Sequence, residues 1–250
     1  MFPTRKCGEY CIQRAAQRVK HLGPGDFAKR LEFCKWLNGS RELHRYILFT
    51  DESQFNRDGV NNTHNSHMWA DDNPHATVES NFQQRFSVSV WCSVLDDKLI
   101  GPFFLESRRT GEAYLRFLQE ELPQLLEDVI LNKQGHMYSQ NNGAAAHSSH
   151  EVRNFVNYNF PGQWIGHGGP HNWPARSPDL SPLDYCVWGW MKELVYSVKV
   201  VTRDALLGRI LDAAGRIRNS QPKLQRATRA VHNRAAACVA AGGGIFENQL

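Results

Sequence analysis

The sequence lacks any apolar run long enough to cross a membrane, and its N-terminus lacks the apolar core that a signal peptide needs. It also has no internal repeat and no low-complexity linker. These absences argue against a membrane protein and a repeat protein, and they favour a soluble one. With 250 residues, 41% of them hydrophobic, the chain can bury one sizeable core with appendages.

Cysteine is scarce and widely spaced. The six cysteines suit a reducing compartment better than a disulfide framework, and they are Cys7, Cys11, Cys34, Cys92, Cys186 and Cys238. The spacing of Cys7, Cys11 and His21 resembles part of a zinc site, but a fourth ligand at a useful distance is missing. We therefore expect no zinc site in this segment.

Charge is nearly balanced overall but uneven along the chain. The net charge is only +4, yet residues 1–45 hold 10 basic and 4 acidic residues, and residues 201–250 hold 8 and 3. Two basic flanks therefore enclose an acidic middle. Lys and Arg supply the sequence-independent part of DNA affinity, so we expect a DNA-contact patch in the tail, formed by Arg216, Arg218, Lys223, Arg226 and Arg229. The alternative is that these charged side chains only form the solvent-exposed face of a helix.

A carboxylate follows a strongly apolar segment near the start of the acidic middle. Residues 46–49 are bulky and apolar, which is typical of a central strand buried on both faces. Ile47, Phe49 and Asp51 point to one side by the period-two rule, which places Asp51 at the carboxyl end of the strand. A buried carboxylate is costly unless it is paired or binds a metal. Taken alone, Asp51 is equally consistent with an exposed strand-end acid.

A second carboxylate lies at the start of a predicted helix. Ser181 is a natural N-cap, Pro182 suits the first helical position, and Asp184 falls in the first turn. Helical spacing continues through an apolar face of roughly four turns, made by Val187, Trp190, Met191 and Leu194. Without other evidence, we interpret Asp184 as the acidic half of a capping box.

The remaining pattern predicts an α/β protein. We expect strands at residues 46–51, 66–70, 86–95, 99–105 and 136–140. We expect helices at residues 21–37 (amphipathic, in two parts), 110–130, from a Ser148 or Ser149 cap across Val152 and Val156, and over most of residues 202–241. The chain then divides into a helical linker-like segment (1–45), a core (46–200) and a basic helical tail (201–250).

A series of short motifs in fixed order carries a family resemblance along nearly the whole chain. They are FTDES at 49–53, HNSHMWA at 64–70, PHAT at 74–77, FSVSVWC at 86–92, LIGPFF at 99–104, TGEAY at 110–114, VRNF at 152–155, FPG at 160–162, WIG at 164–166, SPDL at 177–180 and GGGIFE at 242–247. Each motif is weak alone, but the ordered series resembles the mariner-like transposases of the DDE/DDD superfamily.

The resemblance implies a ribonuclease-H-like core whose three acidic residues hold two divalent cations, Mg²⁺ or Mn²⁺. Asp51 corresponds to the first acid and Asp184 to the third, while the second position falls on Asn142. Members usually read Gln-Asp-Gly-Ala-Pro-Pro-His there, whereas this chain reads NNGAAAH at 141–147. The spacing is kept, with 41 residues between Asn142 and Asp184.

The amide at Asn142 keeps the size of the expected carboxylate but removes its negative charge. Hard divalent cations prefer carboxylate oxygens, so the resemblance predicts weakened metal binding and impaired strand cleavage. Asn142-Gly143 is also a favoured turn dipeptide, which is compatible with the same position. His147 could line the site or brace the following helix, and we favour the bracing role.

The resemblance also implies DNA as the partner and the nucleus as the location, leaves a homodimer open and gives no reason to expect a small-molecule substrate. Relatives carry paired helix-turn-helix modules ahead of the core, and residues 1–45 resemble the inter-domain segment instead, so we expect weak sequence-specific end binding. Three interpretations stay open: a catalytic-domain fragment with impaired nuclease activity, a non-enzymatic nucleic-acid-binding protein retained by a host, and a domain whose DNA affinity has decayed.

Overall fold

The structure is a computed structural model that describes residues 21–57, 59, 86–106 and 110–247. The predicted strand at 66–70, the motifs at 64–70 and 74–77, and Cys7 and Cys11 lie outside these described residues. Within the described part, no helix is both long and apolar enough to span a membrane.

The centre of the fold is a mixed sheet of five strands with the order β3-β2-β1-β4-β5. The strands are β1 (Ile47–Asn56), β2 (Ser87–Leu95), β3 (Lys98–Leu105), β4 (Tyr138–Gln140) and β5 (Trp164–Ile165). The first three form an antiparallel meander, and β4 pairs with β1 in parallel. The central strand β1 is therefore the one element with an antiparallel neighbour on one side and a parallel neighbour on the other.

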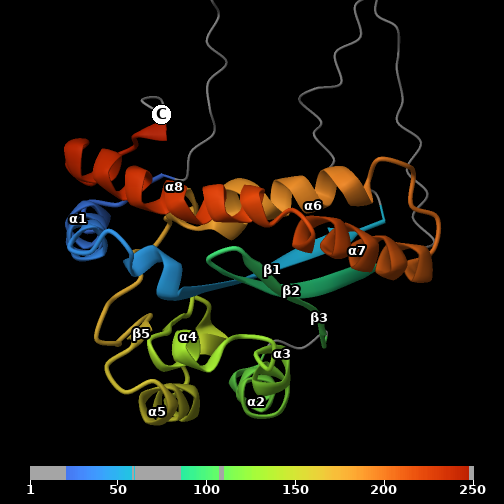
Figure 1. Ribbon diagram of the computed structural model, residues 1–250, viewed down its shortest axis with the longest axis horizontal. Helices are drawn as coiled ribbons and strands as arrows, with labels where there is room; N and C mark the ends of the chain where they lie inside the picture. The colour runs from blue at the N-terminus through green and yellow to red at the C-terminus, as the bar shows by residue number, and fades with distance from the viewer. Residues whose placement is uncertain (1–20, 58, 60–85, 107–109, 248–250) are drawn as a thin grey trace, which may run out of the picture.

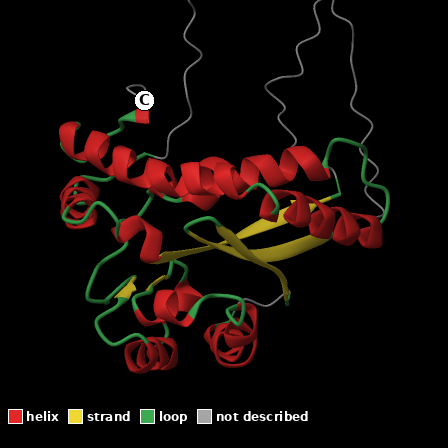
Figure 2. Ribbon diagram, in the orientation of Figure 1, coloured by secondary structure: helices red, strands yellow, loops and turns green. Residues whose placement is uncertain are grey.

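Helices cover both faces of this sheet, giving three layers (Figures 1 and 2). One face carries α1 (Asp26–Asn38), α6 (Trp188–Val195), α7 (Arg203–Arg218) and α8 (Gln221–Ala240). The other carries α2 (Gly111–Arg116), α3 (Leu122–Leu125), α4 (Leu131–Gly135) and α5 (His150–Asn159). Each helical layer packs against one face of the sheet and forms a separate apolar core there, because successive strand residues point to opposite faces. The mixed α/β fold is as expected.

Short helical segments connect these elements. Single turns of 3₁₀-helix precede β1 (η1, Leu43–Tyr46), α5 (η4, Ala145–Ser148) and Ser181 (η5, Pro178–Leu180). Two π-helical turns, η3 (Phe117–Glu121) and η6 (Leu183–Val187), lead into α3 and α6. The π-turn η6 carries Asp184 and is followed without a break by α6.

Several predicted boundaries were wrong. The first strand does not end at residue 51, because β1 stays paired with β2 as far as Asn56. The predicted helix at 21–37 is a single helix that begins at Asp26, after Gly23-Pro24-Gly25. The helix predicted for 110–130 ends at Leu125, and the strand predicted for 136–140 is shorter because α4 extends to Gly135.

The cap predicted at Ser148 or Ser149 is Ser149, whose side chain accepts a hydrogen bond from the Val152 amide at the start of α5. The Thr202 side chain caps α7 through the Ala205 amide, and this cap was not predicted. Such side-chain acceptors satisfy amide groups that have no partner inside the helix. The apolar face predicted for the Asp184 helix was partly wrong, since Trp190 and Leu194 are half-buried, while Val187, Trp188, Met191 and Val195 are buried.

A buried arginine joins both ends of the described chain to the Ser-Pro-Asp motif. Arg30 on α1 is 1% exposed and donates to both carboxylate oxygens of Asp179, at 2.8 and 2.6 Å. It also donates to Ser177 Oγ at 2.7 Å and to the Gly243 carbonyl at 2.8 Å. A planar guanidinium suits such a set of acceptors. This contact fixes the segment that leads into η6.

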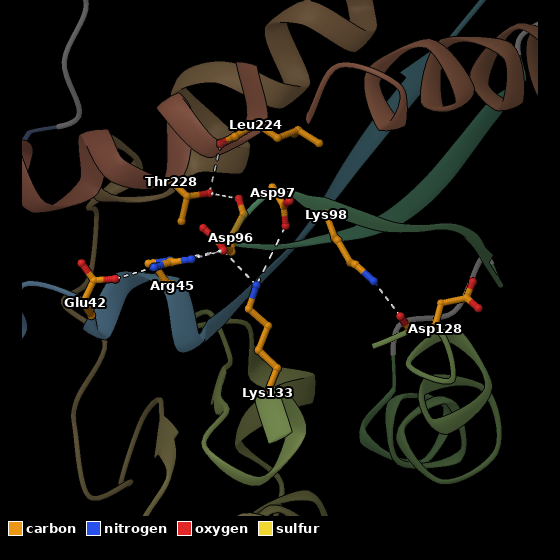
Figure 3. A network of polar contacts seen from close by, with 9 residues as sticks. All are labelled: Glu42, Arg45, Asp96, Asp97, Lys98, Asp128, Lys133, Leu224 and Thr228. Atoms are coloured by element: carbon orange, nitrogen blue, oxygen red, sulfur yellow. Dashed lines mark hydrogen bonds and ion pairs between the residues drawn. The ribbon is translucent and has the colours of Figure 1, made fainter. Parts of the chain in front are cut away.

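The turn between β2 and β3 is anchored by a buried acid. Asp96 has a φ of 55° and a nearly inaccessible side chain. Its carboxylate accepts from Lys133 Nζ at 2.8 Å and from the Arg45 guanidinium at 3.2 Å, and its carbonyl accepts from Thr228 Oγ1 at 2.6 Å (Figure 3). The β2–β3 turn therefore connects η1, α4 and α8 to the sheet through hydrogen bonds.

Candidate active site

Asp51 lies on the central strand just beyond the last residue of β1 that pairs with β4, Phe49. Its two carboxylate oxygens have different partners. Oδ1 accepts from the Asn142 side-chain amide at 2.9 Å, and Oδ2 accepts from the Trp188 indole N–H at 2.8 Å. A carboxylate at this place is thus held by donors from two elements, the β4–η4 connection and α6.

The environment disfavours the charged form of Asp51. Burial raises the pKa of its carboxyl above the ordinary value, and the negative charge of Glu52 adds to the rise, while the Trp188 and Asn142 hydrogen bonds offset part of it. The hydrogen-bond donors that hold this carboxylate are neutral groups.

Asn142 is placed by the end of β4. Gln140, the last residue of β4, is fixed on Thr50 by two hydrogen bonds: the Thr50 amide donates to Gln140 Oε1 at 2.9 Å, and Thr50 Oγ1 donates to the Gln140 carbonyl at 2.7 Å. Two residues later, Asn142 Oδ1 accepts from the Ala144 amide at 3.0 Å. This side-chain turn is one that Asn forms readily.

The orientation of the Asn142 amide follows from these contacts. Because its oxygen already accepts from the Ala144 N–H, its nitrogen is the atom that faces Asp51. An amide nitrogen has no lone pair available for a cation. The second position of the predicted triad thus presents a donor, not a ligand, to the first.

Asp184 lies in the first turn of the helical run that continues into α6. Its amide donates to Ser181 Oγ at 3.4 Å, as expected for a capped start, and its side chain is exposed. Trp188, which binds Asp51, lies four residues further along the same run. The structure therefore joins Asp51 and Asn142 directly, and connects Asp184 to them through the helix that carries Trp188.

Two features of this site were missed from the sequence. Trp188 was not singled out, although it lies one turn after Asp184 and an indole N–H usually needs an acceptor when it is buried. Glu52 was quoted only as part of a motif, yet its Oε1 lies 3.0 Å from His147 Nε2 with both side chains buried. His147 also stacks on Tyr114 at a ring distance of 3.9 Å. These contacts connect His147 to β1 and α2, and the predicted bracing of the following helix stays a prediction.

The residues at the site do not fit a two-metal centre as they stand. Among the residues that the structure describes, no three His, Cys, Asp or Glu side chains gather closely enough to hold a metal ion. Both Asp51 oxygens accept from N–H donors, and one of those donors is the amide of Asn142. The donor set here suits a hydrogen-bonded cluster better than a pair of divalent cations.

A largely apolar cavity of about 420 Å³ adjoins the site on the other face of β1. Its wall includes Glu52 and His147, and its floor includes Phe103, Tyr114 and Phe117. Because Asp51 and Glu52 are consecutive strand residues, they point to opposite faces. The cavity therefore contacts the buried Glu52–His147 pair and not the Asp51 carboxylate.

The five residues of the predicted DNA patch are exposed along the end of α7 and the first half of α8. Their surroundings differ. Arg218 donates to the carbonyls of Leu99 and Gly101 on β3, and the Lys223 ammonium lies 3.5 Å from the centre of the Trp190 ring. Arg216, Arg226 and Arg229 form no ion pair within the described part of the chain. These three are the most available cations of the set.

Comparison with known proteins agrees with this architecture. No protein-family model matches the chain. The Tc3 transposase of a transposable element of Caenorhabditis elegans is 29% identical over 199 residues, which are 78% of this chain and 56% of that protein. The chain thus spans little more than half the length of the curated relative that it matches.

Solved structures match more completely. The Mos1 mariner paired-end complex with Mn superposes with a TM-score of 0.75 at 19% identity, covering 96% of this chain and 69% of that chain. The isolated catalytic domain of Mos1 mariner transposase gives a TM-score of 0.65 at 18% identity, covering 92% of this chain and all of that chain.

The sheet order and flanking helices define a ribonuclease-H-like protein. The chain is similar in sequence to Tc3 transposase, and it shares the fold of the Mos1 mariner transposase catalytic domain.

Proposed function

We propose that this domain binds DNA, that it descends from enzymes of metal-dependent DNA cleavage and transfer, and that Asn142 impairs the cleavage step. The observation that carries the proposal is the orientation of the Asn142 amide. Its oxygen is engaged by the Ala144 N–H and its nitrogen donates to Asp51, so the second position offers no negative charge to a cation.

Known complexes of relatives support the ancestral activity. The Mos1 structures include paired-end complexes with Mn and with Mg, a pre-cleavage transpososome and a strand-transfer complex. By analogy, the ancestral form of this site used divalent cations on DNA ends, and its working assembly held two copies. A DNA partner also makes the nucleus the expected location.

A second candidate function is a non-enzymatic nucleic-acid-binding protein retained by a host. The specific observation in its favour is that each carboxylate oxygen of Asp51 accepts from a neutral N–H donor, one from Asn142 and the other from Trp188. The two candidate functions differ in whether this chain retains any metal-dependent nicking of DNA.

Plasmid nicking by this chain and by its Asn142→Asp variant separates them. Aspartate keeps the acceptor for the Ala144 amide and replaces only the donor that faces Asp51. We expect the parent to be inactive with Mg²⁺ and the variant to gain nicking of at least a hundredfold, since removal of one electrostatic contact commonly costs this much in rate. Nicking by the parent with Mg²⁺ at the rate of the variant would refute the role of Asn142.

Two controls sharpen the nicking experiment. Asp51→Asn in the Asn142→Asp background removes the first acid and should abolish any gained activity. Because Asn-Gly bonds deamidate, the parent preparation needs mass spectrometry of the peptide with Asn142, and a mass gain there would explain residual activity. A variant as inactive as the parent would show that another defect limits cleavage and would favour the host-retained binding protein.

DNA binding is tested by its salt dependence. We expect nonspecific duplex affinity to fall steeply with salt, and the Arg216→Gln, Arg226→Gln double variant to bind more weakly with a salt slope smaller by about 2. Arg116→Gln on α2 is the matched control, because Arg116 is an exposed cation on the opposite face of the sheet. An unchanged slope in the double variant would place the DNA elsewhere.

A further inference from the structure

A second pocket, which is polar, lies beside the residues that precede β1. It has a volume of about 520 Å³ and is formed between the residues around η1 and the middle of α8. Its walls consist of charged and polar side chains, namely Arg41, Glu42, His44, Arg45, Arg229, His232 and Asn233. We call it the η1–α8 pocket. Asp51 lies six positions after Arg45, up to roughly 20 Å of extended chain, and none of the residues that line this pocket belongs to the candidate active site.

His44 is the buried polar residue of this pocket. Its side chain is only 5% exposed, and neither ring nitrogen has a hydrogen-bond partner. A buried polar group without a partner costs about 1–3 kcal/mol, so such groups usually have a ligand or a structural partner. Burial lowers the pKa of His44, which keeps the ring neutral near pH 7 with one N–H to donate.

His232 on α8 lies across the pocket, with its ring centre 6.2 Å from that of His44. When the Asn38 amide is oriented to satisfy both of its polar atoms, its nitrogen donates to His232 Nδ1 at 3.2 Å. Nδ1 then acts as the acceptor, which leaves Nε2 as the donor nitrogen of this ring. The two imidazoles can therefore each offer an N–H donor.

The charges around the pocket are unbalanced in the positive direction. Arg45 is paired with Glu42 at 2.6 Å and with Asp96 at 3.2 Å, so its charge is compensated (Figure 3). Arg41 and Arg229 form no ion pair with any residue that the structure describes. Both are exposed, and Glu42 is the only carboxylate among the lining residues. The charge of Arg229 also acts on Glu42, but that carboxylate has its close ion pair with Arg45. The pocket thus combines two exposed guanidinium groups that lie outside the ion pairs of the described residues with two imidazole donors.

We propose that the η1–α8 pocket binds a phosphate group, held by Arg41, Arg229 and the imidazoles of His44 and His232. Guanidinium groups bind phosphate oxygens with paired, charge-assisted hydrogen bonds, and an anion supplies the acceptor that His44 lacks. The phosphate can come from a DNA backbone or from free inorganic phosphate. The site does not depend on the chemistry at Asp51.

Thermal unfolding of the full chain in phosphate and in chloride at equal ionic strength tests the pocket. We expect phosphate to raise Tm above the chloride value, because a ligand that binds the folded state stabilises it. Arg229→Gln and Arg41→Gln should each weaken phosphate affinity about tenfold, as expected for losing a charge-assisted contact. Arg116→Gln is the matched control, since it removes an exposed arginine of α2 outside the pocket and should leave the affinity unchanged.

A competition arm identifies the source of the phosphate. If a short nonspecific duplex weakens inorganic phosphate binding to the parent chain, the natural ligand is a DNA backbone phosphate. If the duplex binds without affecting phosphate affinity, the ligand is free phosphate. Both results support the pocket. It is overturned if phosphate gives no more stabilisation than chloride, or if Arg229→Gln and Arg41→Gln both retain the affinity of the parent.

Discussion

The contact between Asn142 and Asp51 shows how one atom changes the chemistry of a site. An aspartate at residue 142 would accept from the Ala144 amide just as Asn142 does, but its second oxygen would face the Asp51 carboxylate. Two carboxylates at this distance repel each other unless a proton or a cation lies between them. The amide removes that conflict, and it removes the reason for a cation to bind.

Asn142→Asp is therefore expected to destabilise the metal-free protein by about 1–3 kcal/mol, through the lost hydrogen bond and the new repulsion. Mn²⁺ or Mg²⁺ should restore the loss in the variant and leave the parent unchanged. Urea unfolding in the presence of a chelator measures the loss of stability, and urea unfolding with each cation measures its restoration. Asn142→Ala is the control, because it also loses the hydrogen bond but adds no carboxylate, so cation-dependent stabilisation of that variant would contradict the argument.

Trp188 is the other donor to Asp51, and its removal has a titration signature. Burial raises the pKa of Asp51, and the indole hydrogen bond opposes that rise. Trp188→Phe should raise this pKa further and cost about 1–2 kcal/mol of stability, since a buried donor and some packing are lost. Carboxyl ¹³C NMR of Asp51 over pH measures the shift. Trp190→Phe should leave the pKa unchanged, and a lowered pKa in Trp188→Phe would show that the hydrogen bond does not stabilise the charged form.

At the scale of elements, the start of the Asp184 helix depends on α1. Arg30 reaches from α1 to Asp179 and Ser177 just before η6, and it also contacts the carbonyls of Gly243 and Gly244 after α8. The Ser-Pro-Asp and Gly-Gly-Gly motifs, which are far apart in the sequence, thus share one buried cation. Their role in this chain is to hold the helix that carries Asp184 and Trp188 against the sheet.

Replacing Arg30 by Met should cost about 3–5 kcal/mol, because the Asp179 carboxylate would be left without its buried partner. Chemical unfolding measures the loss. Lys29→Met is the matched control, since it removes an exposed cation from the neighbouring position of α1 and should change stability by less than about 0.5 kcal/mol. An Arg30→Met variant as stable as the control would mean that the arginine cluster contributes no net stability.

Much of the element order could be predicted from local pattern, and the errors have physical causes. The central strand was identified from its apolar residues 46–49, but its extension to Asn56 depends on pairing with β2, which local sequence does not encode. The cap at Ser148 or Ser149 could be predicted because a capping side chain acts within its own turn. The division into residues 1–45, 46–200 and 201–250 stays a prediction.

The candidate site was also only partly predictable, because local sequence does not show which residues meet in space. Asp51, Asn142 and Asp184 were selected through a family resemblance, and the structure brings the first two into contact. Trp188 and the Glu52–His147 pair could not be selected, because their significance arises from long-range contacts across 137 and 95 positions of the chain. The direction of the Asn142 amide also follows from its neighbours in space and not from its residue type.

At the scale of the whole molecule, the Asp96 turn connects the layers. Its carboxylate is approached by Lys133 from α4 and Arg45 from η1, and its carbonyl by Thr228 from α8 (Figure 3). Burial raises the pKa of Asp96, but the hydrogen bonds and charges of Lys133 and Arg45 outweigh it, so the net pKa is below the ordinary value of 3.8. Ionised Asp96 therefore stabilises the fold that joins both helical layers to the sheet.

A lowered carboxyl pKa gives stability that is present above the unfolded value and is lost as pH falls through the folded value. We expect Asp96→Asn to lose about 2–3 kcal/mol at pH 7. The difference from the parent should shrink as pH falls below about 4, where the unfolded parent begins to bind a proton at Asp96, and should disappear below the lower folded pKa. Urea unfolding from pH 7 to pH 3 measures this. Asp97→Asn is the matched control. Asp97 is more exposed than Asp96, and its carboxylate lies as far as 3.9 Å from Lys133 Nζ, so this substitution should lower the stability only slightly at every pH. A constant difference between Asp96→Asn and the parent across this range would show that packing, and not the charge of Asp96, connects the layers.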